Sequence, residues 1–402
     1  MLIAGGAFRD RQFRLFFGGV FFAVQAIWIQ RVTLGWLAWE RTGSARVVGL
    51  VAALSLLPTL FAGPFFGVLA DRVDIRRASL VTNGLMAVVL AGLAMVAGQV
   101  GALGLGAAAL AIGVISAAHH PVRMSLGPRL VSGDMVQHVV SATALNFNIA
   151  RLVAPVFAGW IIATSGGGTA LWIAAICYVP MLAVLPVLQP RALAPRAPSP
   201  FLRDLREGIA HAWTTPLIRQ ALLITLVFAT VARGALEVLP VLADGGFGRG
   251  AAGLGFLTGA AGAGALASAV MKAAGVGAVG ARIPMAVWAA AITGQGAVVA
   301  MGLAPSWPLA LLATALAGFC STWCGVSLQS AIQTDLPDGL RGRVMSLWVV
   351  VGFGTVAIGS LGIGVLADGF GISTALAIAG ALGAAAMGGV AMGVRSRANR
   401  PM

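Results

Sequence analysis

Long runs of apolar residues, separated by short polar breaks, cover almost the whole chain of 402 residues. A helix that crosses a bilayer needs about 20 mainly apolar residues, and twelve runs reach that length. In the first half they cover residues 13–39, 47–70, 78–98, 104–125, 139–164 and 169–189. In the second half they cover residues 217–243, 251–271, 283–303, 308–332, 344–367 and 373–394. The pattern predicts an all-α membrane protein with twelve transmembrane helices.

The longest polar segment, residues 190–216, stands at the middle of the chain and is rich in Pro and Arg. It predicts a cytoplasmic linker between an N-terminal six-helix bundle, residues 1–189, and a C-terminal six-helix bundle, residues 217–402. At an offset of 205 residues the halves match at several small residues, such as Gly159 with Gly364. Six passes are an even number, so we expect two parallel repeats related by an axis along the membrane normal.

The basic residues predict the orientation, because Lys and Arg are enriched in cytoplasmic loops. Twenty of the 26 lie in the breaks or at the ends of runs on the same side as the N-terminus, three lie in the opposite loops and three lie deeper within runs. Both termini are therefore expected in the cytoplasm of a protein of the bacterial inner membrane.

Composition narrows the class of protein. Hydrophobic residues make up 59% of the chain and charged residues 9%, against about 25% charged in a soluble domain. This excludes a soluble enzyme, a disordered chain and a coiled coil. The net charge of +14 is spread between the apolar runs, which argues against a nucleic-acid partner. Cys177, Cys320 and Cys324 show no zinc spacing, and no nucleotide-binding loop is present, so no metal and no cofactor are expected.

Residues 63–77 read GPFFGVLADRVDIRR. They resemble the loop signature between helices 2 and 3 of the major facilitator superfamily, although Asp74 replaces its usual second glycine. Residues 146–159 and 341–347 resemble the branch of proton-driven exporters that includes macrolide efflux proteins and the enterobactin exporter. The resemblance implies that Asp71 pairs with the start of helix 11. It implies gating roles for the following residues: Gly67, Asp71, Arg72, Arg76, Pro155, Gly159 and Arg341. In the antiporter signature around Pro155, two glycines have become Ala154 and Ala158.

Ionisable side chains in mid-membrane are functional candidates by default. Four fall inside the predicted spans: Arg31, Arg151, Arg233 and Glu237. Arg233 and Glu237 are four residues apart and would share one face of an α-helix, and with Arg31 they would form a charge cluster. Two interpretations of Glu237 stay open. It carries the coupling proton, or it is a static ion-pair partner of the arginines.

The same arginines make the predicted cavity net positive, which favours an anionic or zwitterionic amphipathic substrate. Arg151 either binds an anionic group of the substrate or has a structural role only. The residues expected to line the substrate cavity are Gln25, Arg31, Asn146, Arg151, Arg233 and Glu237. Trp28 and other tryptophans either add aromatic surface to the cavity or face lipid.

These observations predict a secondary active transporter and not an enzyme, because no clustered catalytic set is found. We expect it to export a small amphipathic molecule, drug- or siderophore-like, by alternating access and proton antiport. The expected partners are the substrate, protons and the lipid bilayer, with the protein acting as a monomer. The alternatives are a lysophospholipid flippase or an importer on the same fold.

Overall fold

The computed structural model describes residues 6–191, 209–277, 283–336 and 338–398, and every regular element in these ranges is helical. The chain divides into two compact units. Unit 1 comprises Met1–Gly43, Leu57–Ala197 and Arg249–Gly259, and unit 2 comprises Ser44–Leu56, Pro198–Gly248 and Ala260–Met402.

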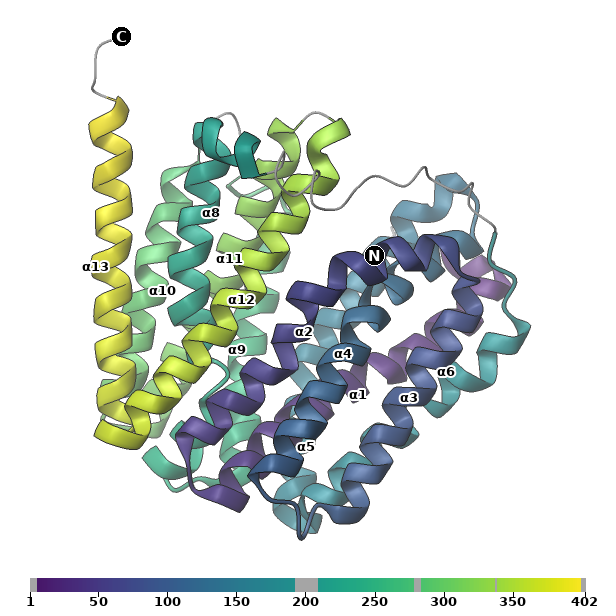
Figure 1. Ribbon diagram of the computed structural model, residues 1–402, viewed down its shortest axis with the longest axis horizontal. Helices are drawn as coiled ribbons and strands as arrows, with labels where there is room; N and C mark the ends of the chain where they lie inside the picture. The colour runs from purple at the N-terminus through teal and green to yellow at the C-terminus, as the bar shows by residue number, and fades with distance from the viewer. Residues whose placement is uncertain (1–5, 192–208, 278–282, 337, 399–402) are drawn as a thin grey trace. The chain divides into compact units, whose positions relative to one another are not determined.

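Unit 1 is built on long helices that pack side by side (Figure 1). They are α1 (Arg11–Thr42), the second part of α2 (Ala45–Arg72), α3 (Ile75–Val96), α4 (Ala102–Leu126), α5 (Val136–Ile176) and α6 (Val179–Val184). Asp10 begins α1, because its carboxylate accepts the N–H groups of Gln12 and Phe13, which have no partner inside the helix. Gly43 ends α1 with φ of 59°, a left-handed conformation that glycine adopts without strain.

Helix α5 makes two passes in one continuous element. The sequence predicts spans at 139–164 and 169–189, with a turn between them, whereas the helix runs from Val136 to Ile176 and bends at Gly166, where φ is 82°. A residue with a Cβ would be strained there, so the glycine run at residues 166–168 supplies the reversal. The second pass continues through α6 and the short helix η4 (Leu185–Val187).

Unit 2 holds the start of α2 and most of the second half of the chain (Figure 1). Its helices are α8 (Pro216–Phe228), the part of α9 (Gly250–Ala273) from Ala260 onward, α10 (Met285–Leu303), α11 (Trp307–Asp335), α12 (Asp338–Phe370) and α13 (Ile372–Ala398). Helices α9 and α11 come close through two glycines. A methyl group on Gly264 would overlap the Ala315 carbonyl, and one on Gly318 would overlap the Ala261 carbonyl. Small residues of this kind let membrane helices pack backbone to backbone.

The span predicted at 217–243 is not one regular α-helix. After α8 the chain forms a π-helix, η5 (Ala229–Arg233), then a turn, then a second π-helix, η6 (Val241–Gly246). In the turn, Leu236, Glu237 and Val238 bond to carbonyls three residues back. Pro240 follows directly, and its missing N–H and its ring are incompatible with a regular α-helix through this point.

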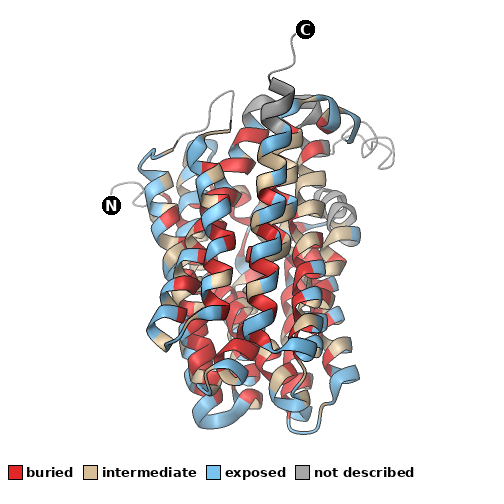
Figure 2. Ribbon diagram, turned by 90° about the vertical axis from the view of Figure 1, so that its left-hand side faces the viewer, coloured by how far each residue is buried: buried red, intermediate tan, exposed pale blue. Residues whose placement is uncertain are grey.

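The described helices account for twelve passes. Ten segments are long and apolar enough to cross a membrane, and the described part of α2 adds a shorter apolar helix, Ala45–Phe61. One of the ten, Gly133–Val187, is 55 residues long and contains the two passes of α5 and α6. The prediction of an all-α membrane protein is therefore confirmed. Figure 2 shows buried residues on the inward sides of the helices and exposed residues on the outward sides of the helices that face the viewer.

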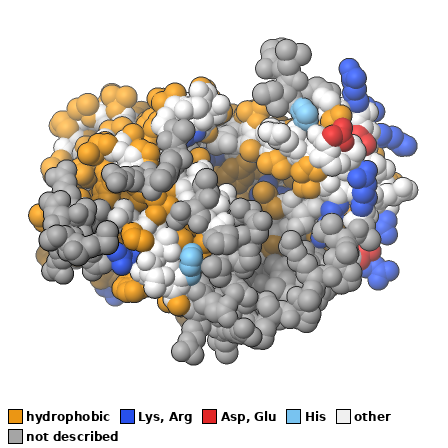
Figure 3. All heavy atoms as spheres, turned by 90° about the horizontal axis from the view of Figure 1, so that it is seen from above, with side chains coloured by type: hydrophobic (Ala, Val, Ile, Leu, Met, Phe, Trp, Pro, Cys, Tyr) orange, Lys and Arg blue, Asp and Glu red, His pale blue; other side chains and the backbone are white. Residues whose placement is uncertain are grey.

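Several segments predicted to be cytoplasmic meet at one end of unit 1. The side chain of Gln12 bonds to the backbone of Val187 and Gln189. Arg76 donates a hydrogen bond to the Pro186 carbonyl over 3.2 Å. The Arg191 N–H donates to the Arg129 carbonyl at 2.9 Å, in the short helix η2 (Gly127–Leu130) that follows α4. On the face seen in Figure 3, Lys and Arg side chains gather along one edge and outnumber the Asp and Glu side chains beside them.

Candidate functional site

Unit 1 carries a cluster of arginines and aromatic rings on α1 and α5. The guanidinium carbons of Arg31 and Arg151 lie 5.5 and 5.8 Å from the centroid of the Trp28 ring. The Phe147 ring lies beside the Trp28 ring, with 5.6 Å between the two ring centroids. A guanidinium within about 6 Å of an aromatic centroid is attracted by the ring quadrupole. The structure thus brings together two predicted cavity residues through a tryptophan.

The fold explains the spacing of this cluster. Trp28 and Arg31 are three residues apart on α1, and Phe147 and Arg151 are four apart on α5, so each pair shares one helix face. Arg31 is exposed on unit 1, Arg151 is half-buried, and Trp28 is buried. The cluster therefore consists of two guanidinium groups that lie against one buried aromatic ring.

The other two predicted cavity residues of unit 1 differ from each other. Asn146 is buried, and its amide nitrogen donates to the Val20 carbonyl of α1 over 3.4 Å. Its Oδ1 atom is buried without a hydrogen-bond partner among the described residues. Asn146 therefore ties α5 to α1. Gln25 is half-buried on α1.

In unit 2, Arg233 closes the π-helix η5, and its guanidinium carbon lies 5.8 Å from the centroid of the Phe353 ring on α12. Glu237 stands four residues later in the turn. The regular α-helix expected around these two residues is not found, because a π-helix and a turn occupy this stretch. That the two side chains share a face and pair with each other remains a prediction. A π-helix within a membrane pass is often found at a functional site. The predicted cluster with Arg31 of unit 1 remains a prediction.

Pro155 and Gly159 of α5 face the first turns of α9, within unit 1. A methyl group on Gly159 would come within 2.6 Å of the Ala251 carbonyl oxygen and 2.8 Å of the Gly255 Cα. One on Gly255 would come within 2.8 Å of the Pro155 carbonyl oxygen. The motif residues thus form a smooth contact between backbones, as the resemblance implies for a bending helix.

The signature loop is described only in part. The side chains of Gly67, Asp71, Arg72 and Arg341 lie outside the described residues. Asp74 caps α3 by accepting the N–H groups of Arg76 and Arg77. This explains why an aspartate stands where the signature has its second glycine.

Two residues that the sequence pattern does not mark as site residues are prominent in the structure. Arg123, near the end of the run at 104–125, lies in the last turns of α4, and its guanidinium carbon is 5.8 Å from the centroid of the Phe147 ring. Asp368 was not singled out, yet its carboxylate caps the start of α2. A signal for Asp368 was present, because the pentapeptide GVLAD at residues 364–368 repeats residues 67–71.

Comparison with known proteins places the chain in a family. The model of the transmembrane secretion effector family matches residues 4–399. The multidrug efflux pump Tap of Mycobacterium tuberculosis is 28% identical over 375 residues, which cover 87% of this chain and 85% of the pump. The enterobactin exporter EntS of Escherichia coli is 26% identical over 325 residues, which cover 79% of this chain and 73% of the exporter.

Solved structures agree on the fold. The crystal structure of the nucleoside transporter NupG has a TM-score of 0.74 at 12% identity, and covers 96% of this chain and 99% of its own. That of the POT family transporter PepTSo has a TM-score of 0.75 at 12% identity, and covers 98% and 99%. At this identity the likeness shows the fold alone.

Proposed function

The chain belongs to the transmembrane secretion effector family of the major facilitator superfamily, and from that premise we propose the way in which it works. Like its relatives, it is a membrane efflux transporter and not an enzyme. We propose that it exports a small amphipathic molecule from the cytoplasm by alternating access, coupled to protons that move inward. The observation that carries this proposal is the match of the family model over nearly the whole chain.

The charges within the spans support a substrate with negative charge. Arg31, Arg151 and Arg233 outnumber the one glutamate, Glu237, among the ionisable residues predicted at mid-membrane depth. Two of the arginines stack on Trp28 in unit 1, and the third stacks on an aromatic ring in unit 2. Guanidinium groups bind carboxylate and phosphate groups through paired hydrogen bonds. We therefore propose an anionic or zwitterionic substrate.

Glu237 is the proposed proton carrier. It stands in the turn between two π-helices, where the backbone leaves regular helix geometry and can rearrange at low cost. A carboxylate at this place would release its proton when an arginine approaches it and would bind one when the arginine moves away. Alternating movement of the helices would thereby couple proton binding to transport.

Glycine contacts support the alternating-access part of the proposal. In unit 1, Gly159 of α5 packs on Gly255 of α9, and in unit 2, Gly364 of α12 packs on the first turn of α2. Gly159 and Gly364 correspond to each other in the repeat. Contacts between smooth backbones separate and re-form without interlocking side chains, as alternating access requires.

The test is transport in inside-out vesicles with an imposed pH gradient and both termini on the outside of the vesicle. Ethidium, erythromycin and a catecholate siderophore are the probes. We expect gradient-dependent uptake of at least one probe, lost in Glu237→Gln and retained in Glu40→Gln, a matched change near the end of α1. Uptake unchanged in Glu237→Gln would make Glu237 a static partner of the arginines. If no probe moves under any gradient, export fails, and lysophospholipid flipping becomes the function to assay.

A further inference from the structure

Three arginines of unit 1 gather where α3 begins and where the chain leaves α6 and η4. Arg76 and Arg77 belong to the first turn of α3, and Arg191 follows η4. Helix α3 packs against α6 and η4 (Figure 1), which brings the three residues to one end of one surface. Arg77 and Arg191 are exposed there, and Arg76 is half-buried. These three residues form the arginine rim.

Hydrogen bonds to the backbone fix the place of the rim. The Arg76 guanidinium donates to the Pro186 carbonyl at 3.2 Å, and the Arg191 N–H donates to the Arg129 carbonyl at 2.9 Å. The segment between Pro186 and Arg191 is also held to α1 through both amide atoms of the Gln12 side chain. A ligand that binds at the rim therefore does not have to order the backbone beneath it.

The charge of the rim is not balanced by the acidic residue beside it. Asp74 stands just before α3, and one oxygen of its carboxylate accepts the N–H groups of Arg76 and Arg77 at 2.8 and 3.2 Å. The other oxygen lies 4.0 Å from the Arg77 Nε atom, which is beyond hydrogen-bonding distance. No other described residue at positions 74–96 or 176–191 is acidic. The rim therefore presents an excess of positive charge to its surroundings.

An apolar surface continues from the rim along the two helices. The exposed apolar residues are Val81, Leu85 and Val88 on α3, and Val179, Ala183 and Val187 along α6 and η4. On α3 they repeat at the spacing of one helix face, and that face begins at Arg77. Both stretches lie in segments long and apolar enough to cross a membrane, so the exposed face is the one that meets hydrocarbon. Cations at one end and apolar side chains below them match the two parts of a phospholipid.

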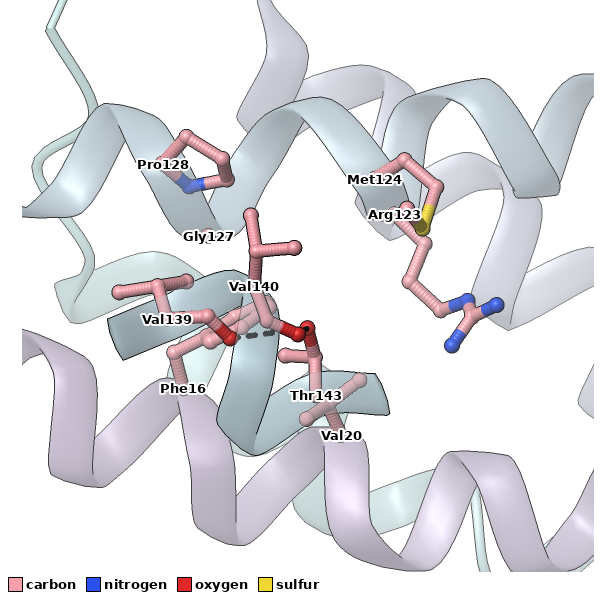
Figure 4. Close-up of a pocket in the computed structure, with 9 residues that line it drawn as sticks. All are labelled: Phe16, Val20, Arg123, Met124, Gly127, Pro128, Val139, Val140 and Thr143. Carbon is pink, nitrogen blue, oxygen red and sulfur yellow. Dashed lines mark hydrogen bonds between the residues drawn. The ribbon is translucent and has the colours of Figure 1, made fainter. Parts of the chain in front are cut away.

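The interior of unit 1 offers a phosphate group much less room. The hollow between α1, α4 and α5 is lined by Phe16, Val139 and Val140 and has room for about one water molecule. Arg123 borders this hollow, and its guanidinium extends away from it (Figure 4). The exposed rim is therefore the better place in unit 1 for an anion of that size.

We propose that the arginine rim binds the phosphate of an anionic phospholipid, whose acyl chains lie on the exposed face of α3 and along α6. Guanidinium groups bind phosphate oxygens through paired hydrogen bonds. Arginines at the membrane surface attract anionic headgroups, and basic sites between transmembrane helices bind such lipids. The bound lipid joins the start of α3 to the end of η4. This inference is independent of which molecule the protein exports.

Lipid binding to the purified protein in a neutral detergent tests the proposal. Dioleoylphosphatidylglycerol and dioleoylphosphatidylcholine are titrated separately, and native mass spectrometry gives the dissociation constant of the first bound lipid. Glycerophosphoglycerol, which is the anionic headgroup without acyl chains, is titrated in a third arm. The test variant is Arg77→Gln with Arg191→Gln, which leaves the Arg76 side chain and the Arg191 N–H in place.

The control variant is Arg9→Gln with Arg11→Gln. These two arginines are exposed at the start of α1, which Gln12 joins to the same end of unit 1. The control thus removes the same charge from the same end of the protein and leaves the rim intact. A difference between the two double variants reports the site and not the total charge.

We expect the wild-type protein to bind phosphatidylglycerol about tenfold or more tightly than phosphatidylcholine. Loss of Arg77 and Arg191 should weaken phosphatidylglycerol about twenty- to thirtyfold, because each arginine at an anionic surface contributes about fivefold. Phosphatidylcholine binding should not change. The control variant should bind phosphatidylglycerol as the wild type does. Added phosphatidylglycerol should also raise the Tm of the wild type and of the control more than that of the test variant.

Three results would overturn the proposal. Equal binding of the two lipids to the wild type removes the preference for an anion. Equal loss of phosphatidylglycerol binding in both double variants shows that the lipid responds to the total charge of this end of the protein. Glycerophosphoglycerol that binds as tightly as the whole lipid assigns the rim to a soluble phosphate. No transport is measured, so a positive result stands even if the vesicle assay finds no export.

Discussion

The contact between α9 and α11 gives the sharpest test of the packing in unit 2. A methyl group on Gly318 would overlap the Ala261 carbonyl oxygen and come within 2.7 Å of its carbonyl carbon. Ordinary contact begins at 3.4 Å, so the carbonyl carbon alone requires the helices to separate by about 0.7 Å, and the closer oxygen requires more, which weakens dispersion along the contact. The obstacle is backbone, and no side-chain rotation relieves it. Gly325 lies on the same helix with nothing within 4 Å of its added methyl group.

These geometries predict opposite signs for one chemical change. Gly318→Ala introduces an overpacking penalty of about 3 kcal/mol and gains about 1 kcal/mol of helix propensity, for a net loss of about 2 kcal/mol. Gly325→Ala keeps the gain of about 1 kcal/mol. At about 2–4 °C per kcal/mol for a unit of 150–250 residues, the apparent Tm values should differ by roughly 6–12 °C.

The assay is thermal unfolding of the purified protein in one detergent at one scan rate, followed by tryptophan fluorescence. The double variant serves as a control, because the two residues have no shared partner and their effects should add. A Gly318→Ala variant that melts at or above Gly325→Ala would refute the argument that the α9–α11 contact is made backbone to backbone.

Three further predictions concern other places in the two units. Gly364→Ala should slow transport in the vesicle assay severalfold, because its methyl group overlaps the α2 backbone, whereas Gly362→Ala, with open space around it, should transport at the wild-type rate; equal rates would contradict the close contact. The Tyr178 hydroxyl is buried with no hydrogen-bond partner among the described residues. Tyr178→Phe should therefore unfold at the same denaturant concentration or a higher one, with a gain in unfolding free energy of up to about 1–3 kcal/mol from the desolvation penalty that is removed. A loss of unfolding free energy above about 1 kcal/mol would reveal a hydrogen-bond partner. The Lys272 Nζ atom lies 3.9 Å from the centroid of the Trp323 ring, so Lys272→Met should lower stability by about 0.5–1 kcal/mol in chemical unfolding, with Lys272→Arg close to wild type; equal losses in both would assign the effect to the backbone carbonyl that Lys272 also binds.

Much of the fold could be predicted because the bilayer imposes one dominant rule on the sequence. Each pass must be apolar for about 20 residues and must satisfy its own backbone, so the runs mark the helices directly. The same rule made Arg31, Arg151, Arg233 and Glu237 conspicuous. It did not mark Arg123, because an arginine near the end of a run is ascribed to the adjoining loop, whereas α4 continues through it to Leu126.

The hydrophobic pattern does not predict where the backbone departs from a regular α-helix. The first part of the run at 217–243 is apolar enough to count as a membrane span, and hydropathy does not distinguish an α-helix from the π-helices η5 and η6. The face shared by Arg233 and Glu237 was inferred from a spacing that holds only in a regular α-helix. Likewise, Gly166 turns one helix into two passes through its positive φ, a property of the local backbone that glycine permits and does not require.

The sequence by itself determined the class of the protein, the number of passes, the repeat and the charges that fall within the apolar runs. It did so because apolar length and charge placement are local properties, read one segment at a time. Only the tertiary structure decided which side chains meet: Trp28 between two arginines, Phe147 beside Arg123, and Asp368 on the first turn of α2. Apart from Trp28 and Arg31, which are neighbours on α1, these contacts join residues of different helices, 24 positions apart for Arg123 and Phe147 and 323 apart for Ala45 and Asp368. They depend on helix rotation and register, which the packing of whole helices sets and which a periodic apolar pattern leaves free.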